Sequence, residues 1–150
     1  MSYTNLIYHI IFRTRKSVEA IPIEHEDVLY RYIRGVVKEK GGVLYRVGGM
    51  PNHIHLCVQL PATLAVADFM RDLKTSASKF LNTKKELFSE FDGWGKSYCA
   101  LSCSYSSKES VVEYIKKQKR HHLSCAFQDE LQEILKENGV DYNDDYFLKE

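Results

Sequence analysis

The chain has 150 residues and a formal net charge of +1, a length that predicts a single domain over residues 1–150. Its longest apolar run, Leu6 to Phe12, is interrupted by His9 and is too short to cross a bilayer, so we expect no membrane partner. The four cysteines form no CxxC pair and no signal peptide is recognised, so we expect a cytoplasmic protein with reduced thiols.

The first predicted elements are a strand and a helix. Alternating apolar residues predict a strand over Leu6–Arg13, and it leads into a basic loop that contains Arg15. After Pro22, apolar residues recur at helical spacing until the pair Gly41-Gly42, where a helix should end.

The middle of the chain predicts a hairpin followed by a second helix. Residues 43–47 and 53–60 read as strands, and the glycine-rich residues 48–52 read as the turn between them. An amphipathic helix follows over residues 66–81, and a polar loop over residues 82–96.

The last elements complete the predicted order. Residues 97–105 read as a fourth strand, and Ser106 with Glu109 reads as a capping box that begins a helix through His122. A final helix is predicted over residues 126–138. The order strand, helix, strand, strand, helix, strand predicts an α+β fold, namely a ferredoxin-like or RRM-like βαββαβ antiparallel sheet with two additional C-terminal helices.

His53 and His55 are the strongest candidates for a metal site. They lie two residues apart in a predicted strand, so both imidazoles should point to one face, while Ile54 and Leu56 belong to an apolar face that can pack on a core. Such a pair is also found at ordinary half-buried strand positions. A metal site therefore needs a third ligand.

Tyr114 and Gln118 could complete the site. They are separated by one helical turn and lie on one face, so either could reach a strand if the helix packs on the sheet. Three neutral ligands, His53, His55 and Gln118, would favour Mg2+ or Mn2+ and leave the ion its full charge for polarising a phosphate. Tyr114 could then attack phosphorus. The alternative is that Tyr114 packs beside Ile115 and that Gln118 is solvated.

Basic residues gather after the tyrosine. Residues 126–150 hold eight of the 20 acids and two of the 21 bases, a net charge of −6, which leaves 12 acids and 19 bases, +7, for residues 1–125. The segment after Tyr114 contributes densely to that excess with Lys116, Lys117, Lys119 and Arg120, which suits a phosphate backbone. A solvated basic surface and a helix end favoured by the helix dipole explain the same charges.

The run Pro51-Asn52-His53-Ile54-His55-Leu56, followed by Tyr114-Ile115-Lys116-Lys117-Gln118, resembles the single-tyrosine HUH transposases of small insertion sequences and the related REP-associated tyrosine transposases. The segment from His9 to Arg15, the stretch Lys74-Thr75-Ser76, and Trp94 with Tyr98 support this resemblance, which covers nearly the whole chain.

The resemblance implies a metal-dependent enzyme. Mg2+ or Mn2+ would be held by His53, His55 and Gln118, and Tyr114 would cleave single-stranded DNA to leave a 5′-phosphotyrosine and a free 3′-hydroxyl. It also implies that hairpins at the element ends are recognised, and that a homodimer forms composite active sites. The DNA contacts expected from the basic pattern and the resemblance are Arg13, Arg15, Lys74, Lys117, Arg120 and His121.

Two other functions are compatible with the same residues. A domesticated protein could bind hairpin DNA or RNA without strand transfer. A metal-dependent nuclease could release its product by hydrolysis, and Tyr114 would then be dispensable.

Overall fold

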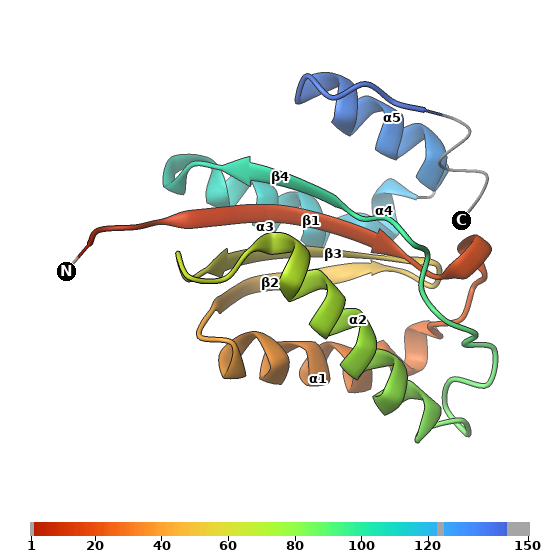
Figure 1. Cartoon of the computed structure of the whole chain (residues 1–150). Helices are drawn as coiled ribbons and strands as arrows, with labels where there is room; N and C mark the ends of the chain where they lie inside the picture. The colour runs from red at the N-terminus through yellow and green to blue at the C-terminus, as the bar shows by residue number, and fades with distance from the viewer. Residues whose placement is uncertain (1, 123–124, 144–150) are drawn as a thin grey trace.

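Four antiparallel strands form one sheet in the computed structural model, which describes residues 2–122 and 125–143. The strands are β1 (Leu6–Arg13), β2 (Val43–Met50), β3 (His53–Leu60) and β4 (Cys99–Cys103), and their order in the sheet is β2-β3-β1-β4 (Figure 1). This is the arrangement that the βαββαβ order predicts, and it confirms the fold.

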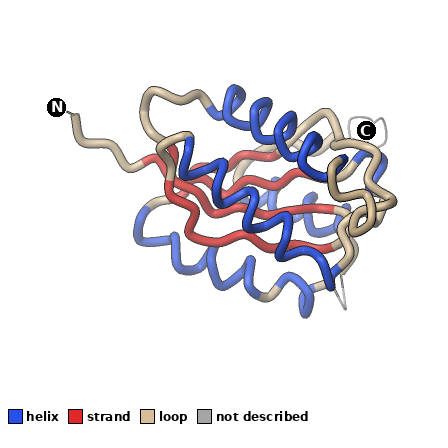
Figure 2. The backbone as a smooth tube through the Cα atoms, turned by 90° about the horizontal axis from the view of Figure 1, so that it is seen from below, coloured by secondary structure: helices blue, strands red, loops and turns tan. Residues whose placement is uncertain are grey.

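Helices cover both faces of the sheet. On one face lie α1 (Glu26–Glu39) and α2 (Val66–Asn82), which are in front of the sheet in Figure 2. On the other face lie α3 (Lys108–Lys116), α4 (Gln118–His121) and α5 (Phe127–Glu137) (Figure 1). Short 3-10 helices occur at Arg15–Ser17, Ile23–His25 and Tyr105–Ser107. No helix among the described residues is long and apolar enough to span a membrane.

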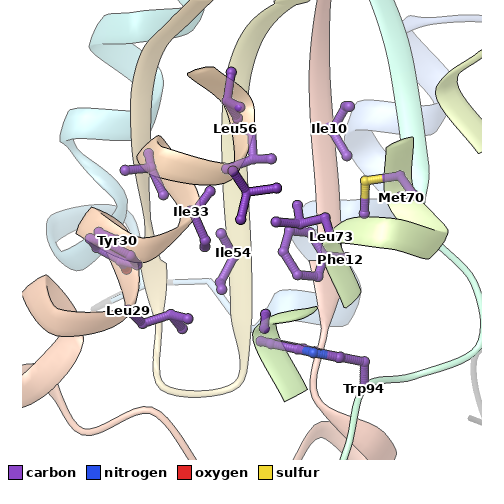
Figure 3. Close-up of a cluster of buried hydrophobic side chains, with 14 of the residues drawn as sticks. Ile10, Phe12, Leu29, Tyr30, Ile33, Ile54, Leu56, Met70, Leu73 and Trp94 are labelled. Carbon is purple, nitrogen blue, oxygen red and sulfur yellow. The ribbon is translucent and has the colours of Figure 1, made fainter. Parts of the chain in front are cut away.

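The larger core lies between the sheet and the α1–α2 layer. The predicted apolar face of β3 is fully buried there, and Figure 3 shows Ile54 and Leu56 next to Ile33 of α1. The loop between α2 and β4, expected to be polar, also contributes buried aromatic rings to this core, among them Trp94 against Phe12 at a centroid distance of 5.0 Å. Each such side chain contributes roughly 1.5–3 kcal/mol by its burial.

The opposite face carries two smaller apolar clusters. One joins Ile7 and Cys57 of the sheet to Val112 and Ile115 of α3, and the other joins Ile11 to Phe127 and Ile134 of α5. These clusters hold α3 and α5 against the sheet, so this face is covered by the C-terminal helices.

The hairpin turn is shorter than the sequence predicts. Strand β2 continues to Met50, and Gly48 and Gly49 pair with His55 and Ile54 instead of forming the turn. A Cβ on Gly48 would lie 2.9 Å from Ile115 Cγ2, so the glycine is needed for the close approach of α3.

The helix expected up to His122 is interrupted. Lys117, with φ −95° and ψ 12°, separates α3 from α4. The predicted capping box is wrong as well, because the residue before α3 is Ser107, whose side chain does not cap this helix. The capping serine is Ser104, whose hydroxyl accepts from the backbone N–H of Ser107 at 3.2 Å at the start of the preceding 3-10 turn.

Candidate metal and nucleophile site

His53 and His55 lie in the middle of the sheet, because β3 pairs with β1 on one side and with β2 on the other. Both side chains are fully buried, at 0% exposure, and their ring centroids are 5.1 Å apart. They contact Tyr114 of α3, Gln118 of α4 and Phe127 of α5, so they lie on the sheet face that these helices cover, as the strand alternation predicts.

Hydrogen bonds to the Nδ1 atoms orient both imidazoles. His53 Nδ1 lies 2.8 Å from Asn52 Oδ1, a contact that turns Nε2 toward Gln118 and Glu130. His55 Nδ1 lies 2.8 Å from His9 Nε2 of the adjacent strand. His55 Nε2 is buried and has no hydrogen-bond partner among the described residues. An orphaned imidazole nitrogen of this kind is suited to a metal ion.

Burial keeps these histidines neutral. It lowers the pKa of His53 to about 4, an effect that the nearby Glu130 only partly offsets. Burial also lowers the pKa of His55, and burial with the proximity of His55 lowers the pKa of His9 to about 3. His9, a residue of the predicted first strand to which the sequence assigns no role in the metal site, stacks on His55 and supports it.

Gln118 and Tyr114 reach the histidines as their helical spacing predicts. Gln118 is only 1% exposed, and its Oε1 lies 3.2 Å from His53 Nε2. The Tyr114 ring lies 5.8 Å from that of His55, between centroids. The alternative in which Gln118 is solvated is therefore wrong.

Glu130 of α5 is the site residue that sequence reasoning missed. It is 2% exposed and accepts hydrogen bonds at Oε2 from the Tyr114 hydroxyl and, at 2.8 Å, from Gln118 Nε2. Its Oε1 lies 3.4 Å from His53 Nε2 and 3.5 Å from His55 Nε2. The sequence carried one signal, because position 130 falls on the apolar stripe of α5 between Phe127 and Ile134.

The charge states of Glu130 and Tyr114 follow from these contacts. Burial alone would raise the pKa of Glu130, but hydrogen bonding with His122 at 3.0 Å and the contacts with the two strand histidines hold the pKa of this carboxyl well below its usual range. Burial and the adjacent carboxylate raise the pKa of Tyr114 above its usual value. The site thus contains a carboxylate and a neutral phenol that donates to it.

The donor atoms fit a divalent cation. His53 Nε2, His55 Nε2 and an oxygen of Glu130 all lie within 4.8 Å of one another, and Gln118 Oε1 adjoins them. Imidazole nitrogens with carboxylate and amide oxygens are ligands that suit Mn2+ or Mg2+, whereas thiolate ligands are typical of structural zinc sites. A ligand set that includes Glu130 carries a negative charge, whereas the set expected from the sequence, His53, His55 and Gln118, is neutral.

Three of the expected DNA contacts gather around the end of β1 and the loop before β4. Arg13 is buried and donates to Ser17 Oγ at 2.8 Å, and Arg15 lies 3.7 Å from Asp92. Lys74 donates to three backbone carbonyls of that loop, at Gly95, Lys96 and Ser97. These side chains have structural partners within the chain.

The other three expected contacts lie on α4 or just before it. Lys117 and Arg120 are exposed. His121 adjoins the buried site, because its Nε2 lies 3.7 Å from Glu130 Oε2, and its side chain is 34% exposed.

A basic groove adjoins the site along β2. It has a volume of about 790 Å³ and lies between α1 and the α3–α4 segment. Lys119 crosses it to Glu26 at 2.8 Å, and its exposed cations include Arg34, Arg46 and Lys116. Neither of the two arginines was expected to contact DNA.

The chain belongs to the family of IS200-like transposases, whose sequence profile matches residues 2–118. The ISDra2 transposase TnpA of Deinococcus radiodurans is 27% identical over 117 residues, covering 75% of this chain and 84% of that protein. These matches confirm the resemblance found in the sequence and place the chain among DNA-processing enzymes of insertion sequences.

Solved structures agree with the sequence matches. A crystal structure described as a transposase from Deinococcus radiodurans R1 has a TM-score of 0.58 at 25% identity, and the match covers 78% of this chain and 93% of that one. A REP-associated tyrosine transposase bound to a REP hairpin has a TM-score of 0.61 at 14% identity, covering 81% and 72% of the two chains, which shows a shared fold.

Proposed function

We propose that this transposase cleaves and rejoins single-stranded DNA at insertion-sequence ends through a covalent 5′-phosphotyrosine on Tyr114. A divalent metal would be held by His53, His55 and Gln118. The observation that carries the proposal is the convergence of Tyr114 and Gln118 on a buried histidine pair, one nitrogen of which has no partner among the described residues.

The residues suggest how the reaction proceeds. The Tyr114 oxygen attacks phosphorus, the bond from phosphorus to the 3′-oxygen breaks, and that oxygen takes up a proton to become a 3′-hydroxyl. Glu130 accepts a hydrogen bond from this phenol and so orients its oxygen, and the proton that Tyr114 gives up balances the one that the 3′-oxygen takes up. Attack by another 3′-hydroxyl on the phosphotyrosine reverses the bond changes and joins the strands. Mg2+ or Mn2+ bound by the histidines would stabilise the negative charge on the phosphate.

DNA hairpins are the proposed substrate. The REP-associated transposase of similar fold is bound to a REP hairpin, and the exposed Lys117 and Arg120 of this chain lie beside the site. The groove cations Arg34 and Arg46 extend this basic surface and could bind the phosphates of the strand that enters the site. Arg13, Arg15, Lys74 and His121 remain proposed contacts or supports.

The decisive experiment is a search for a covalent adduct. Labelled single-stranded hairpin DNA is incubated with the protein and Mn2+, and the products are separated under denaturing conditions. The wild type and the Tyr105→Phe control, altered at a tyrosine that is 64% exposed, should both form an adduct. Tyr114→Phe and His53→Ala should form none.

The alternative functions give other results. A domesticated hairpin DNA or RNA binder shifts the DNA in a native gel and forms no adduct. A nuclease that uses water continues to cut the DNA after Tyr114→Phe, and that result would refute the covalent mechanism.

We also propose a homodimer with composite active sites, which the family resemblance supports. Within the single chain, Tyr114 lies beside the chain's own His55. Mixing a His53→Ala chain with a Tyr114→Phe chain tests an exchange of helices between subunits, because only composite sites can restore one working site per mixed dimer. Absence of rescue, with both variants folded and dimeric, contradicts shared sites.

A further inference from the structure

We propose that Glu130 is a fourth protein ligand of the metal held by His53, His55 and Gln118. The inference rests on the proposed function, because it requires that the two histidines bind an ion. It adds a charged ligand from α5, an element that lies beyond the residues matched by the family profile, which end at Gln118.

The position of Glu130 on its helix is the first observation. The other acids of α5, Asp129, Glu133 and Glu137, are exposed, whereas the Glu130 side chain is buried between Phe127 and Ile134. Burying a carboxylate is costly unless charges or hydrogen bonds compensate for the lost water. An apolar residue would suit this position if it served packing alone.

The anchoring of α5 is the second observation. Phe127 stacks on His53 with a centroid distance of 3.9 Å and an interplanar angle of 14°, and Ile134 packs with Ile11 of β1. The helix is therefore fixed on both sides of Glu130, and the carboxylate is directed at the histidines by packing instead of by a flexible loop.

The different contacts of the two carboxylate oxygens of Glu130 are the third observation. Oε2 accepts from Tyr114 and Gln118, which are hydrogen-bond donors. Oε1 faces the Nε2 atoms of the two strand histidines at 3.4 and 3.5 Å, and these nitrogens carry lone pairs when Nδ1 is protonated. One carboxylate oxygen and two imidazole nitrogens that converge within 4.8 Å of one another can each give a lone pair to the same cation, so the cluster has the ligand atoms and the spacing of a divalent metal site.

The chemical consequence is a site of different charge. Three neutral ligands leave a bound Mg2+ or Mn2+ with two positive charges, and a carboxylate reduces that to one. The fourth ligand should therefore strengthen binding of a hard divalent ion and link the position of the ion to that of Tyr114, because one side chain contacts both.

Mn2+ titration without DNA tests the proposal, with free Mn2+ measured by electron paramagnetic resonance. Glu130→Gln should weaken Mn2+ binding by about tenfold or more, while Glu133→Gln, which removes an exposed charge from the same helix, should leave it unchanged. His53→Ala should remove binding. Circular dichroism establishes that each variant is folded.

The outcomes separate this inference from the function it rests on. If Glu130→Gln binds Mn2+ like the wild type while His53→Ala does not, the fourth ligand is refuted and the histidine site stands. If the wild type binds no Mn2+, both proposals fail. Should Glu130→Gln not fold, Glu130→Asp replaces it, with Glu133→Asp as its control. If Glu130→Asp binds Mn2+ more weakly than the wild type and Glu133→Asp does not, the result supports Glu130 as a metal ligand. If both variants bind Mn2+ like the wild type, the proposal is overturned.

Discussion

Replacing Gly48 with alanine should displace the tyrosine helix. A Cβ at this position would lie 2.9 Å from Ile115 Cγ2 and 3.1 Å from the Ile115 carbonyl oxygen. Two carbon atoms prefer a separation of about 3.5–4.0 Å, so α3 must retreat from β2. Overpacking of this kind costs roughly 1–3 kcal/mol of unfolding free energy. Because Tyr114 precedes Ile115, a displacement approaching 1 Å would slow adduct formation by up to about 100-fold.

Gly35→Ala is the matched control for this prediction. Gly35 lies in α1, and its added Cβ would meet nothing within 4 Å, so the same substitution should stabilise the protein by roughly 0.5–1 kcal/mol. Denaturant unfolding and the initial rate of adduct formation are measured for both variants. Equal stability and equal rates in the two variants would refute the idea that the close approach of α3 to β2 positions the nucleophile.

Three further outcomes are expected. His9→Phe removes the hydrogen bond to His55 Nδ1 and should weaken Mn2+ binding by about 10–100-fold, whereas His25→Phe should not; equal affinities would show that His9 does not support the site. In metal-free protein, the folded-state pKa is about 3 for His9 and about 4 for His53, below the unfolded value of 6.5. The unfolded chain then binds more protons, so Tm should fall as the pH is lowered from about 6.5 to about 4, and a constant Tm would contradict buried neutral imidazoles. Lys117→Ala and Arg120→Ala should each reduce the salt slope of hairpin-DNA binding by about one, and unchanged slopes would remove them from the phosphate contacts.

Local patterns were sufficient to predict the sheet. The alternation of residues between two faces predicts the bounds of β1 and β3 correctly, because one face of each strand packs on the larger core. In β3 this apolar face includes Ile54 and Leu56. The glycines of β2 misled the turn prediction, since glycine is typical of turns and the reason for Gly48 is a contact with Ile115, which lies far along the chain.

The candidate site was predictable in part for a related reason. His53 with His55, and Tyr114 with Gln118, are pairs whose spacing places both members on one face of a strand or helix. Glu130 has no such local partner. Its role depends on how α5 packs across the sheet, and a helical pattern reports only that position 130 faces inward. Long-range packing is the information that a single sequence lacks.

The placement of Glu130 near the end of the chain also orders the assembly of the site in time. Gln118 and Glu130 are 12 residues apart, and α5 is the last helix among the described residues. Proteins emerge from the ribosome N-terminal end first, so the histidine strand and the tyrosine helix are synthesised before the carboxylate that joins them. An unfinished chain thus carries Tyr114 without its hydrogen-bond acceptor, and the fully connected site exists only once synthesis has passed α5.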